Sequence, residues 1–252
     1  MRAGMCRCRM APTSPIGKGG ARGAIRHGAT RSRDQPSGLL HVNCAPAFGQ
    51  SQLVSTIPEF LDRYPEDHVA ITLTDQAVDL LKEGVDLAIR VGIAADSSLI
   101  SRKICNLERV ICASPDYLRK FGTPKSPSDL CQHNCLFVTT TQALRRWPFQ
   151  TPNGRTLVEV KGNFSANSAV TVRDLALSGV GIARLGDNIA SEPIREGRLI
   201  PLLMDTHEVE LVPLHALFSL GRHRSPKLVA MLNFLIVKFS NAPWRAALKP
   251  AP

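Results

Sequence analysis

Apolar and polar residues follow two different periods after Gly38, and the changes of period predict strands alternating with helices. Runs of adjacent or alternating apolar residues, as in LLHVNC and VDLAIR, predict strands, whereas apolar residues three and four apart predict helices. The expected elements of this first unit are strands at residues 39–44, 69–73 and 85–90 and helices at residues 48–64 and 78–83. Because strands and helices alternate, we expect parallel strands covered by helices on both faces.

A second group of apolar runs follows a polar linker. RVICAS predicts a strand, and Pro115 opens a helix, since proline is favoured at the first helical position. No clear pattern covers residues 147–154. The expected elements after the linker are a strand at residues 109–114 and a helix at residues 115–121, and then a second unit with strands at residues 135–138, 156–166 and 180–185 and a helix at residues 168–178. An extended segment at residues 209–219 and a helix at residues 226–239 then return the chain to the first unit.

Three loops in the first unit follow the carboxyl ends of its expected strands. They are residues 45–50, 74–76 and 90–93. Ligands of open parallel sheets bind beyond the carboxyl ends of the strands. We therefore expect a ligand of this protein at these loops.

The formal net charge of +10 is concentrated in the first 37 residues, which hold eight Lys and Arg against one Asp. The rest of the chain has 23 basic and 20 acidic residues, so the excess does not describe a basic folded surface. Residues 1–37 are rich in Gly and Arg and poor in large apolar residues, which predicts a disordered tail. With 44% apolar residues overall, the remainder can bury a sizeable core. Its longest apolar stretches, broken by Asn233 and Lys238, are too short to span a membrane.

Cysteine usage bears on the cellular compartment. The seven cysteines are Cys6, Cys8, Cys44, Cys105, Cys112, Cys131 and Cys135. An odd number without a repeated framework favours reduced thiols. A secretory signal needs an apolar segment after its basic start, and residues 1–37 offer Arg, Gly, Pro and Ser instead. We therefore expect a cytoplasmic protein.

Motifs of catalysis and cofactor binding are missing from the sequence. It contains no GxSxG, HExxH or GxxxxGK[ST], so an enzyme is the least supported class and no cofactor is expected. Cys131, His133 and Cys135 offer three zinc-ligand types, but a structural zinc site needs four and no partner motif lies elsewhere, so no metal is expected. Gly179 and Gly181 follow a helix and open a strand, which favours helix termination over a dinucleotide-binding loop.

Several segments between Gly38 and Phe239 together carry a family resemblance. They are GLLHVNCAPAFG, PEFLDRYP, ITLTDQAVDLLKEGVDLAIRVG, SSLISRKI, RVICASPDYLRKFGTPKSPSDLCQHNCL, LALSGVGIA and SPKLVAMLNFL. In order and spacing they resemble the effector-binding domain of LysR-type bacterial transcriptional regulators. The resemblance implies an α/β, two-lobed fold of the type II periplasmic-binding-protein kind, with mixed sheets flanked by helices. It also implies two crossing strands as a hinge and a small organic ligand in the cleft between the lobes.

The resemblance implies boundaries within the chain. Residues 1–37 are expected to form a disordered basic tail, residues 38–240 the effector-binding domain and residues 241–252 a second tail. Within the domain, the first lobe is expected to comprise residues 38–112 and 209–240, and the second lobe residues 113–208.

The resemblance also assigns effector-binding residues, with no catalytic residue among them. They are Ala47, Phe48, Thr74, Arg90, Asn167 and Ser168. The helices beginning near Phe48 and Ser168 would present backbone N–H groups to the cleft from opposite lobes, and such groups attract carboxylates. Many family members carry Ser or Thr where Ala47 stands, so a hydroxyl contact is missing here. Alternatively, Thr74 and Asn167 only cap or turn the backbone, and Arg90 forms a structural ion pair.

The implied function is ligand sensing within a DNA-binding transcription factor, with a small anionic effector as partner. The resemblance implies a homodimer or higher oligomer through the first lobe, and the apolar residues nearly all round the helix at residues 226–239 suggest that this helix is buried from more than one side. No membrane partner is expected. A solute-binding receptor of the same fold remains an alternative, although it would need an export signal or a lipid-anchored cysteine. A headless chain that pairs with full-length regulators is another.

Family members begin with a winged helix-turn-helix of roughly 60 residues, which binds DNA. Residues 1–37 do not resemble it, so this sequence by itself is not expected to read DNA. Two explanations stay open: a misread or frameshifted start before a normal regulator, or a gene for a headless effector domain. The segment DQPSGLL follows the family pattern in register, whereas the residues before it do not, and this favours the misread or frameshifted start. The basic cluster Arg222, His223, Arg224 and Lys227 is expected to be a solvated turn.

Overall fold

The computed structural model describes residues 38–76, 79–92, 99–140, 142–152 and 154–248. The expectations for residues 1–37 lie outside these ranges, as do residues 249–252 of the expected second tail. Two five-stranded sheets and a separate hairpin make up the β-structure of this part of the chain. We call the parts built on the two large sheets the first and second lobes.

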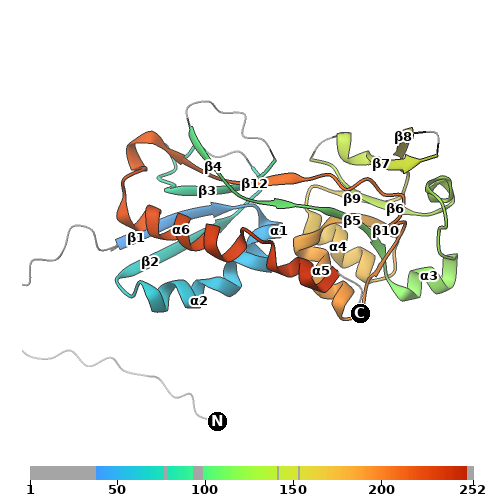
Figure 1. The fold of residues 1–252 in the computed structure, drawn as a ribbon, viewed down its shortest axis with the longest axis horizontal. Coiled ribbons are helices and arrows are strands. Elements are labelled where there is room, and N and C mark those ends of the chain that lie inside the picture. The colour runs from blue at the N-terminus through green and yellow to red at the C-terminus, as the bar shows by residue number, and fades with distance from the viewer. Residues whose placement is uncertain (1–37, 77–78, 93–98, 141, 153, 249–252) are drawn as a thin grey trace, which may run out of the picture. The chain divides into compact units, whose positions relative to one another are not determined.

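The first lobe is built on a sheet with the strand order β2-β1-β3-β12-β4 (Figure 1). Its strands are β1 (Gly38–Cys44), β2 (Asp67–Leu73), β3 (Leu87–Val91), β4 (Leu99–Leu107) and β12 (Val212–Ser219). Strands β2, β1 and β3 are parallel, as the alternation of strands and helices predicted. Strand β12 runs antiparallel to both β3 and β4, so the sheet is mixed.

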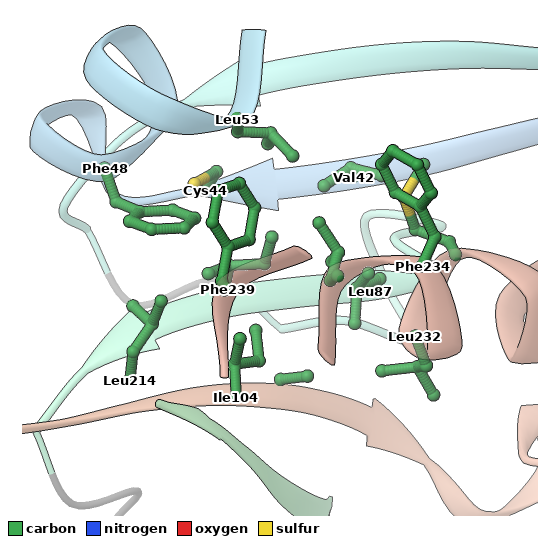
Figure 2. Packing of buried hydrophobic residues seen from close by; sticks show 14 of the residues in the cluster. Val42, Cys44, Phe48, Leu53, Leu87, Ile104, Leu214, Leu232, Phe234 and Phe239 are labelled. Carbon is green, nitrogen blue, oxygen red and sulfur yellow. The ribbon is translucent and has the colours of Figure 1, made fainter. Parts of the chain in front are cut away.

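Helices of the first lobe pack their apolar side chains onto β1 and β3. A continuous helical run consists of α1 (Pro46–Phe48), a π-helical segment (Gly49–Leu53) and α2 (Val54–Arg63), and the last long helix is α6 (Pro226–Phe239). Figure 2 shows Phe48 and Leu53 of the first run meeting Phe239 of α6 over Cys44 of β1. Seven of the fourteen residues of α6 are buried here, whereas Val237 is 79% exposed.

The second lobe is built on a sheet with the strand order β11-β5-β10-β6-β9. Its strands are β5 (Arg109–Ala113), β6 (Cys135–Val138), β9 (Ser165–Ala166), β10 (Ile182–Gly186) and β11 (Ile200–Pro201), with β7 (Arg146–Thr151) and β8 (Gly154–Glu159) as the hairpin. Its helices are α3 (Pro115–Phe121), α4 (Ala169–Leu177) and α5 (Asp187–Arg195). Trp147, Phe149 and Tyr117 fill one of its two apolar clusters.

Short 3-10 helices connect these elements at Pro127–Gln132, Gln142–Arg145 and Leu220–Arg222. Another, Pro243–Leu248, follows α6, where a tail had been expected. We call this last one the C-terminal segment. It packs mainly against α5.

Several elements differ from the sequence-based predictions. The supposed polar linker contains β4, whose exposed Ser101, Arg102 and Lys103 hid its strand character. Strand β5 pairs with β10 and β11, so the change of sheet lies between β4 and β5 rather than at residue 112. Helix α5 was not predicted, because Pro193 and polar residues interrupt its apolar pattern.

Two further predictions fail for local reasons. The described part of the expected helix at 78–83 is a turn, in which the Asp79 carboxylate accepts hydrogen bonds from the backbone N–H groups of Leu81 and Lys82. The expected long strand at 156–166 is split into β8 and β9. Between these strands, Lys161 accepts a 2.9 Å hydrogen bond from the backbone of Cys135, which draws the chain to β6.

The five cysteines in the described ranges are unpaired, and only Cys131 is exposed. Burial raises the pKa of Cys44, Cys112 and Cys135 to about 12 each, so these thiols stay protonated at neutral pH. Among the helices of the described residues, none has both the length and the apolar character that a membrane crossing requires.

Candidate functional site

A cavity of about 130 Å³ lies where the two lobes meet. The first lobe contributes Ala45, Ala47, Asp75, Val91, Leu107 and Val212, and the second contributes Arg109, Val138, Thr140, Leu144, Asn167, Ala169, Gly186, Asn188 and Ile189. Glu108, between β4 and β5, completes the wall. A space of this size suits a small molecule rather than a polymer.

The carboxyl ends of parallel strands from both sheets meet at this cavity. In the first lobe, Ala45 follows β1, Asp75 lies just beyond β2 and Val91 ends β3. In the second lobe, Val138 ends β6 and Gly186 ends β10, which pairs parallel with β6. The cavity therefore occupies the position that ligands take in parallel sheets, in both lobes at once.

The amino ends of two helices of the second lobe also face this space. Ala169 is the first residue of α4, and Asn188 lies in the first turn of α5. The first N–H groups of a helix have no partner within the helix, and the helix dipole is positive at this end. Both helices thus add positive potential to the cavity.

Arg109 is the cation in the cavity wall. Burial and the nearby charge of Arg184 lower its pKa, Glu210 opposes the change, and the resulting pKa is about 10. The guanidinium therefore remains charged at neutral pH. Among the residues that the structure describes, it forms neither a hydrogen bond nor an ion pair. A partly buried guanidinium with free donors is suited to binding a carboxylate or another small anion.

The two carboxylates of the wall already have cations beside them. Glu108 lies 3.0 Å from the guanidinium of Arg245. Burial raises the pKa of Asp75, and the nearby charge of Arg90 partly offsets this. The charge of Arg109 is therefore not cancelled by these two acidic side chains.

Behind Arg109, a polar network joins β10 to the chain that leads back to the first lobe. Arg184 donates a hydrogen bond of 2.9 Å from Nε to Nε2 of buried His207 and pairs with Glu210 at 2.7 Å. Burial, together with the nearby charge of Arg184, lowers the pKa of His207 to about 4. Glu210 is thus engaged by Arg184, and also lies 4.0 Å from Arg155.

The structure brings two of the six expected residues, Ala47 and Asn167, into the cavity wall. Phe48, next to Ala47, instead points into the core of the first lobe, where its ring packs against that of Phe239 (Figure 2). The ring of Trp244 also contacts it. The Phe48 side chain is fully buried and does not line the cavity. The cause is the helical geometry, which turns successive side chains about 100° apart.

Thr74 and Ser168 shape the backbone at the edge of the cavity rather than lining it. The Thr74 hydroxyl accepts a 3.1 Å hydrogen bond from the backbone of Gln76, and the Ser168 hydroxyl caps α4 by accepting one of 3.3 Å from Thr171. The turn-forming alternative for Thr74 thus describes its observed contacts. Because Ser168 fixes the start of α4, it positions Ala169 in the wall.

The guanidinium of Arg90 forms its hydrogen bonds within the first lobe. It donates hydrogen bonds to the backbone oxygens of Ile89 (3.1 Å) and Gln76 (3.2 Å) and to the side chain of Asn43. Burial lowers its pKa, and Asp75 raises it again. These bonds join the carboxyl ends of β1, β2 and β3, so Arg90 supports the loops that carry the wall.

Sequence reasoning missed Arg109, Glu108 and Asn188. Glu108 lies between β4 and β5 and Arg109 begins β5, and a charged pair at the start of a buried strand was the available signal. Asn188 belongs to the unpredicted helix α5. Its side chain donates hydrogen bonds across the lobes to the backbone oxygen of Ala47 (3.4 Å) and to the Ser51 hydroxyl (3.3 Å).

The segment with three zinc-ligand types is spread over different environments. Cys131 is exposed, Cys135 is buried, and His133 contacts the Tyr117 hydroxyl at 3.2 Å. Within the described ranges, no group of three or more His, Cys, Asp or Glu side chains is arranged to hold a metal ion.

Comparison with known families shows which family this chain belongs to. Residues 33–239 match the family model of the LysR substrate binding domain. The chain belongs to the LysR family of transcriptional regulators. The matched LysR domain contains both lobes and the whole cavity wall.

Individual LysR-family relatives agree with this assignment. The chain is 32% identical over 206 residues to the HTH-type transcriptional regulator CrgA of Neisseria meningitidis serogroup C (strain 8013), covering 82% of this chain and 69% of CrgA. It is 29% identical over 208 residues to the HTH-type transcriptional activator TtdR of Escherichia coli (strain K12), covering 82% of this chain and 66% of TtdR. The chain thus spans about two thirds of the length of these regulators.

The solved structure of the CrgA regulatory domain from Neisseria meningitidis superposes with a TM-score of 0.76 at 32% identity. The superposition covers 80% of this chain and 98% of the CrgA domain. The described fold is therefore that of a LysR regulatory domain, of the type II periplasmic-binding-protein-like kind.

Proposed function

We propose that this LysR-family domain senses a small organic anion, which binds in the cavity between the lobes with Arg109 as its main charged contact. The observation that carries the proposal is the guanidinium of Arg109 in the cavity wall, with no hydrogen bond or ion pair to any described residue. A half-buried cation of this kind gains most from a desolvated anionic partner.

Two further features support an anion rather than a cation or a neutral ligand. The amino ends of α4 and α5 add positive potential to the same space. The carboxylates of Glu108 and Asp75 have Arg245 and Arg90 beside them. The rest of the wall is largely apolar, with Val91, Leu107, Val138, Leu144, Ile189 and Val212, which suits the hydrocarbon part of an organic acid.

Ligand binding regulates transcription only if the anion binds two arrangements of the lobes with different affinity. An anion in this cavity touches both lobes at once, so its contacts depend on how the lobes are arranged. Within a LysR-type regulator that carries a DNA-binding helix-turn-helix, such a change in arrangement would be passed on to the DNA-binding part.

Homodimerisation through the first lobe is part of the same proposal. Val237 of α6 and Val54 of α2 are exposed valines on neighbouring helices, which Lys238 and Glu59 join by an ion pair. Sedimentation of the protein at micromolar concentration is expected to give a dimer. A monomer would contradict this part of the proposal.

Thermal-shift screening with acid and amide pairs tests the proposed ligand class. Each aromatic or aliphatic carboxylic acid in the panel is compared with its primary amide, which has nearly the same shape without the charge. At least one acid is expected to raise the melting temperature while its amide does not, because ligand binding stabilises the folded state. A panel in which amides and acids act alike would refute the anionic ligand.

A further inference from the structure

The C-terminal segment, Pro243–Leu248, connects the two lobes. It lies beyond the residues that match the family model. It follows α6 of the first lobe directly and packs mainly against α5 of the second lobe (Figure 1). The match to the family model ends at residue 239, so the family assignment does not account for this segment.

Trp244 fixes the segment to the core of the first lobe. Its side chain is 8% exposed, and its ring lies 6.1 Å from that of Phe48 and 6.0 Å from that of Phe239, measured between centroids. Aromatic pairs at these separations add to the stabilisation from apolar burial. The position of the next residue, Arg245, is therefore set by the first lobe.

Arg245 binds three groups where the chain crosses between the lobes and where α5 begins. Its guanidinium lies 2.7 Å from the carboxylate of Asp187 and 3.0 Å from that of Glu108, and it donates a 2.6 Å hydrogen bond to the backbone oxygen of Asn106. Asp187 is fully buried. A buried carboxylate depends strongly on such a cation, because an unpaired charge away from water is unfavourable.

The groups that Arg245 holds are parts of the cavity wall or its direct neighbours. Glu108 lines the cavity itself. Asp187 stands between Gly186 and Asn188, which both line it. Moving Asp187 would therefore move two wall residues of the second lobe, and moving Glu108 would displace the residue beside Arg109.

We propose that Arg245 is a positioning residue, which sets the arrangement of the two lobes and thereby the shape of the cavity between them. The C-terminal segment transmits the position of the first-lobe core, through Trp244 and Arg245, to the start of α5. The effect on ligand sensing rests on the function proposed above. The effect on lobe arrangement does not, and it is measurable without any ligand.

Pulsed electron paramagnetic resonance between two spin labels tests this proposal on the full chain. The labels are attached to cysteines introduced at exposed Asp62 in α2 and exposed Thr171 in α4, one in each lobe. Cys6, Cys8 and Cys131 are replaced by Ser in this parent protein. The other four cysteines are buried, so their thiols are not expected to react with the label.

Three variants of the parent are compared. Arg245→Gln removes the charge and the fork of donors, whereas Arg245→Lys keeps the charge. Lys238→Gln is the matched control. It also removes a cation from an ion pair, but both Lys238 and its partner Glu59 belong to the first lobe. All variants are first checked for cooperative thermal unfolding.

The label-to-label distance distribution is expected to shift, or to widen roughly twofold, in Arg245→Gln, since the two lobes would lose the contacts that Arg245 makes where they meet. Lys238→Gln is expected to match the parent, and Arg245→Lys to lie nearer to the parent than Arg245→Gln does. An unchanged distribution in Arg245→Gln, or an equal change in Lys238→Gln, overturns the proposal. Should Arg245→Gln fail to fold, Glu108→Gln removes one of the three contacts, and a distribution identical to the parent then overturns it.

The outcome is independent of the acid and amide screen. A distance change with no acid that binds would leave Arg245 as a positioning residue and refute the anionic ligand. An unchanged distance together with a binding acid would overturn the positioning role of Arg245 and support the anionic ligand.

Discussion

The ring of Phe48 meets the ring of Phe239 edge to face, with centroids 5.1 Å apart and an angle of 76° between the planes. This contact joins the start of the first helical run to the end of α6 in the core of the first lobe. Ala47, the preceding residue, lines the cavity. Two adjacent residues therefore have separate roles, one in the core and one in the site.

Replacing Phe48 by Ala is expected to lower stability without removing the ligand contact. A buried Phe→Ala change typically costs about 3–5 kcal/mol of unfolding free energy. Urea denaturation of the variant and the unchanged protein measures this loss. At a temperature where the variant is fully folded, its affinity for a binding acid should stay close to that of the unchanged protein. If the milder Phe48→Leu variant folded normally but lost the acid, Phe48 would be a ligand residue after all.

Gly181, before β10, has no room for a side chain unless its neighbours shift. A Cβ atom there would lie well inside van der Waals contact with the backbone oxygen of Asn134, and backbone cannot yield as a flexible side chain does. Gly181→Ala should cost about 1–3 kcal/mol of unfolding free energy, as overpacking typically does. Gly221→Ala is the control, since a Cβ at Gly221 meets nothing within 4 Å. Equal stability of the two variants would contradict this account.

His207 is expected to make the stability of the second lobe depend on acid pH. Burial lowers its pKa to about 4, compared with roughly 6.5 in the unfolded chain. Because the unfolded state then binds the proton more readily, the contribution of His207 is complete above pH 6.5 and is lost as the pH falls towards 4.

The variant His207→Gln keeps an acceptor for Arg184 and removes the titrating group. Between pH 7 and pH 5, its unfolding free energy should fall by about 2 kcal/mol less than that of the unchanged protein. Denaturant unfolding at both pH values measures the difference, with exposed His41→Gln as the control. Parallel loss of stability in His207→Gln and the unchanged protein would show that His207 does not cause the acid sensitivity.

Much of the fold was predictable where local pattern and burial agree. Strands β1 and β3 are apolar runs buried in the sheet, and Pro115 and Pro226 start helices α3 and α6 as expected. Strand β4 was missed because its middle is polar and exposed. Helix α5 was missed because tertiary contacts, including those with the C-terminal segment, bury its polar Asp187, Asn188 and Ser191.

The site was less predictable than the fold, because it depends on how the two lobes meet. The loops after the first three strands were expected at the ligand, and Ala45, Asp75 and Val91 in or beside them line the cavity. Arg109 reaches the cavity from β5 of the second sheet. No local sequence pattern shows that its guanidinium is left without a partner among the described residues.

Titration calorimetry of a binding acid against Arg109→Gln tests the central claim most directly. The protein is compared with Arg109→Gln and with the control Arg119→Gln, which removes an exposed arginine paired with Asp116 at the surface. Loss of a charge-assisted contact should weaken binding by about 1.5–3 kcal/mol, or roughly 10- to 150-fold, in Arg109→Gln alone. If Arg109→Gln bound the acid as tightly as Arg119→Gln and the unchanged protein, the anion would not be held by Arg109 and the account would be wrong.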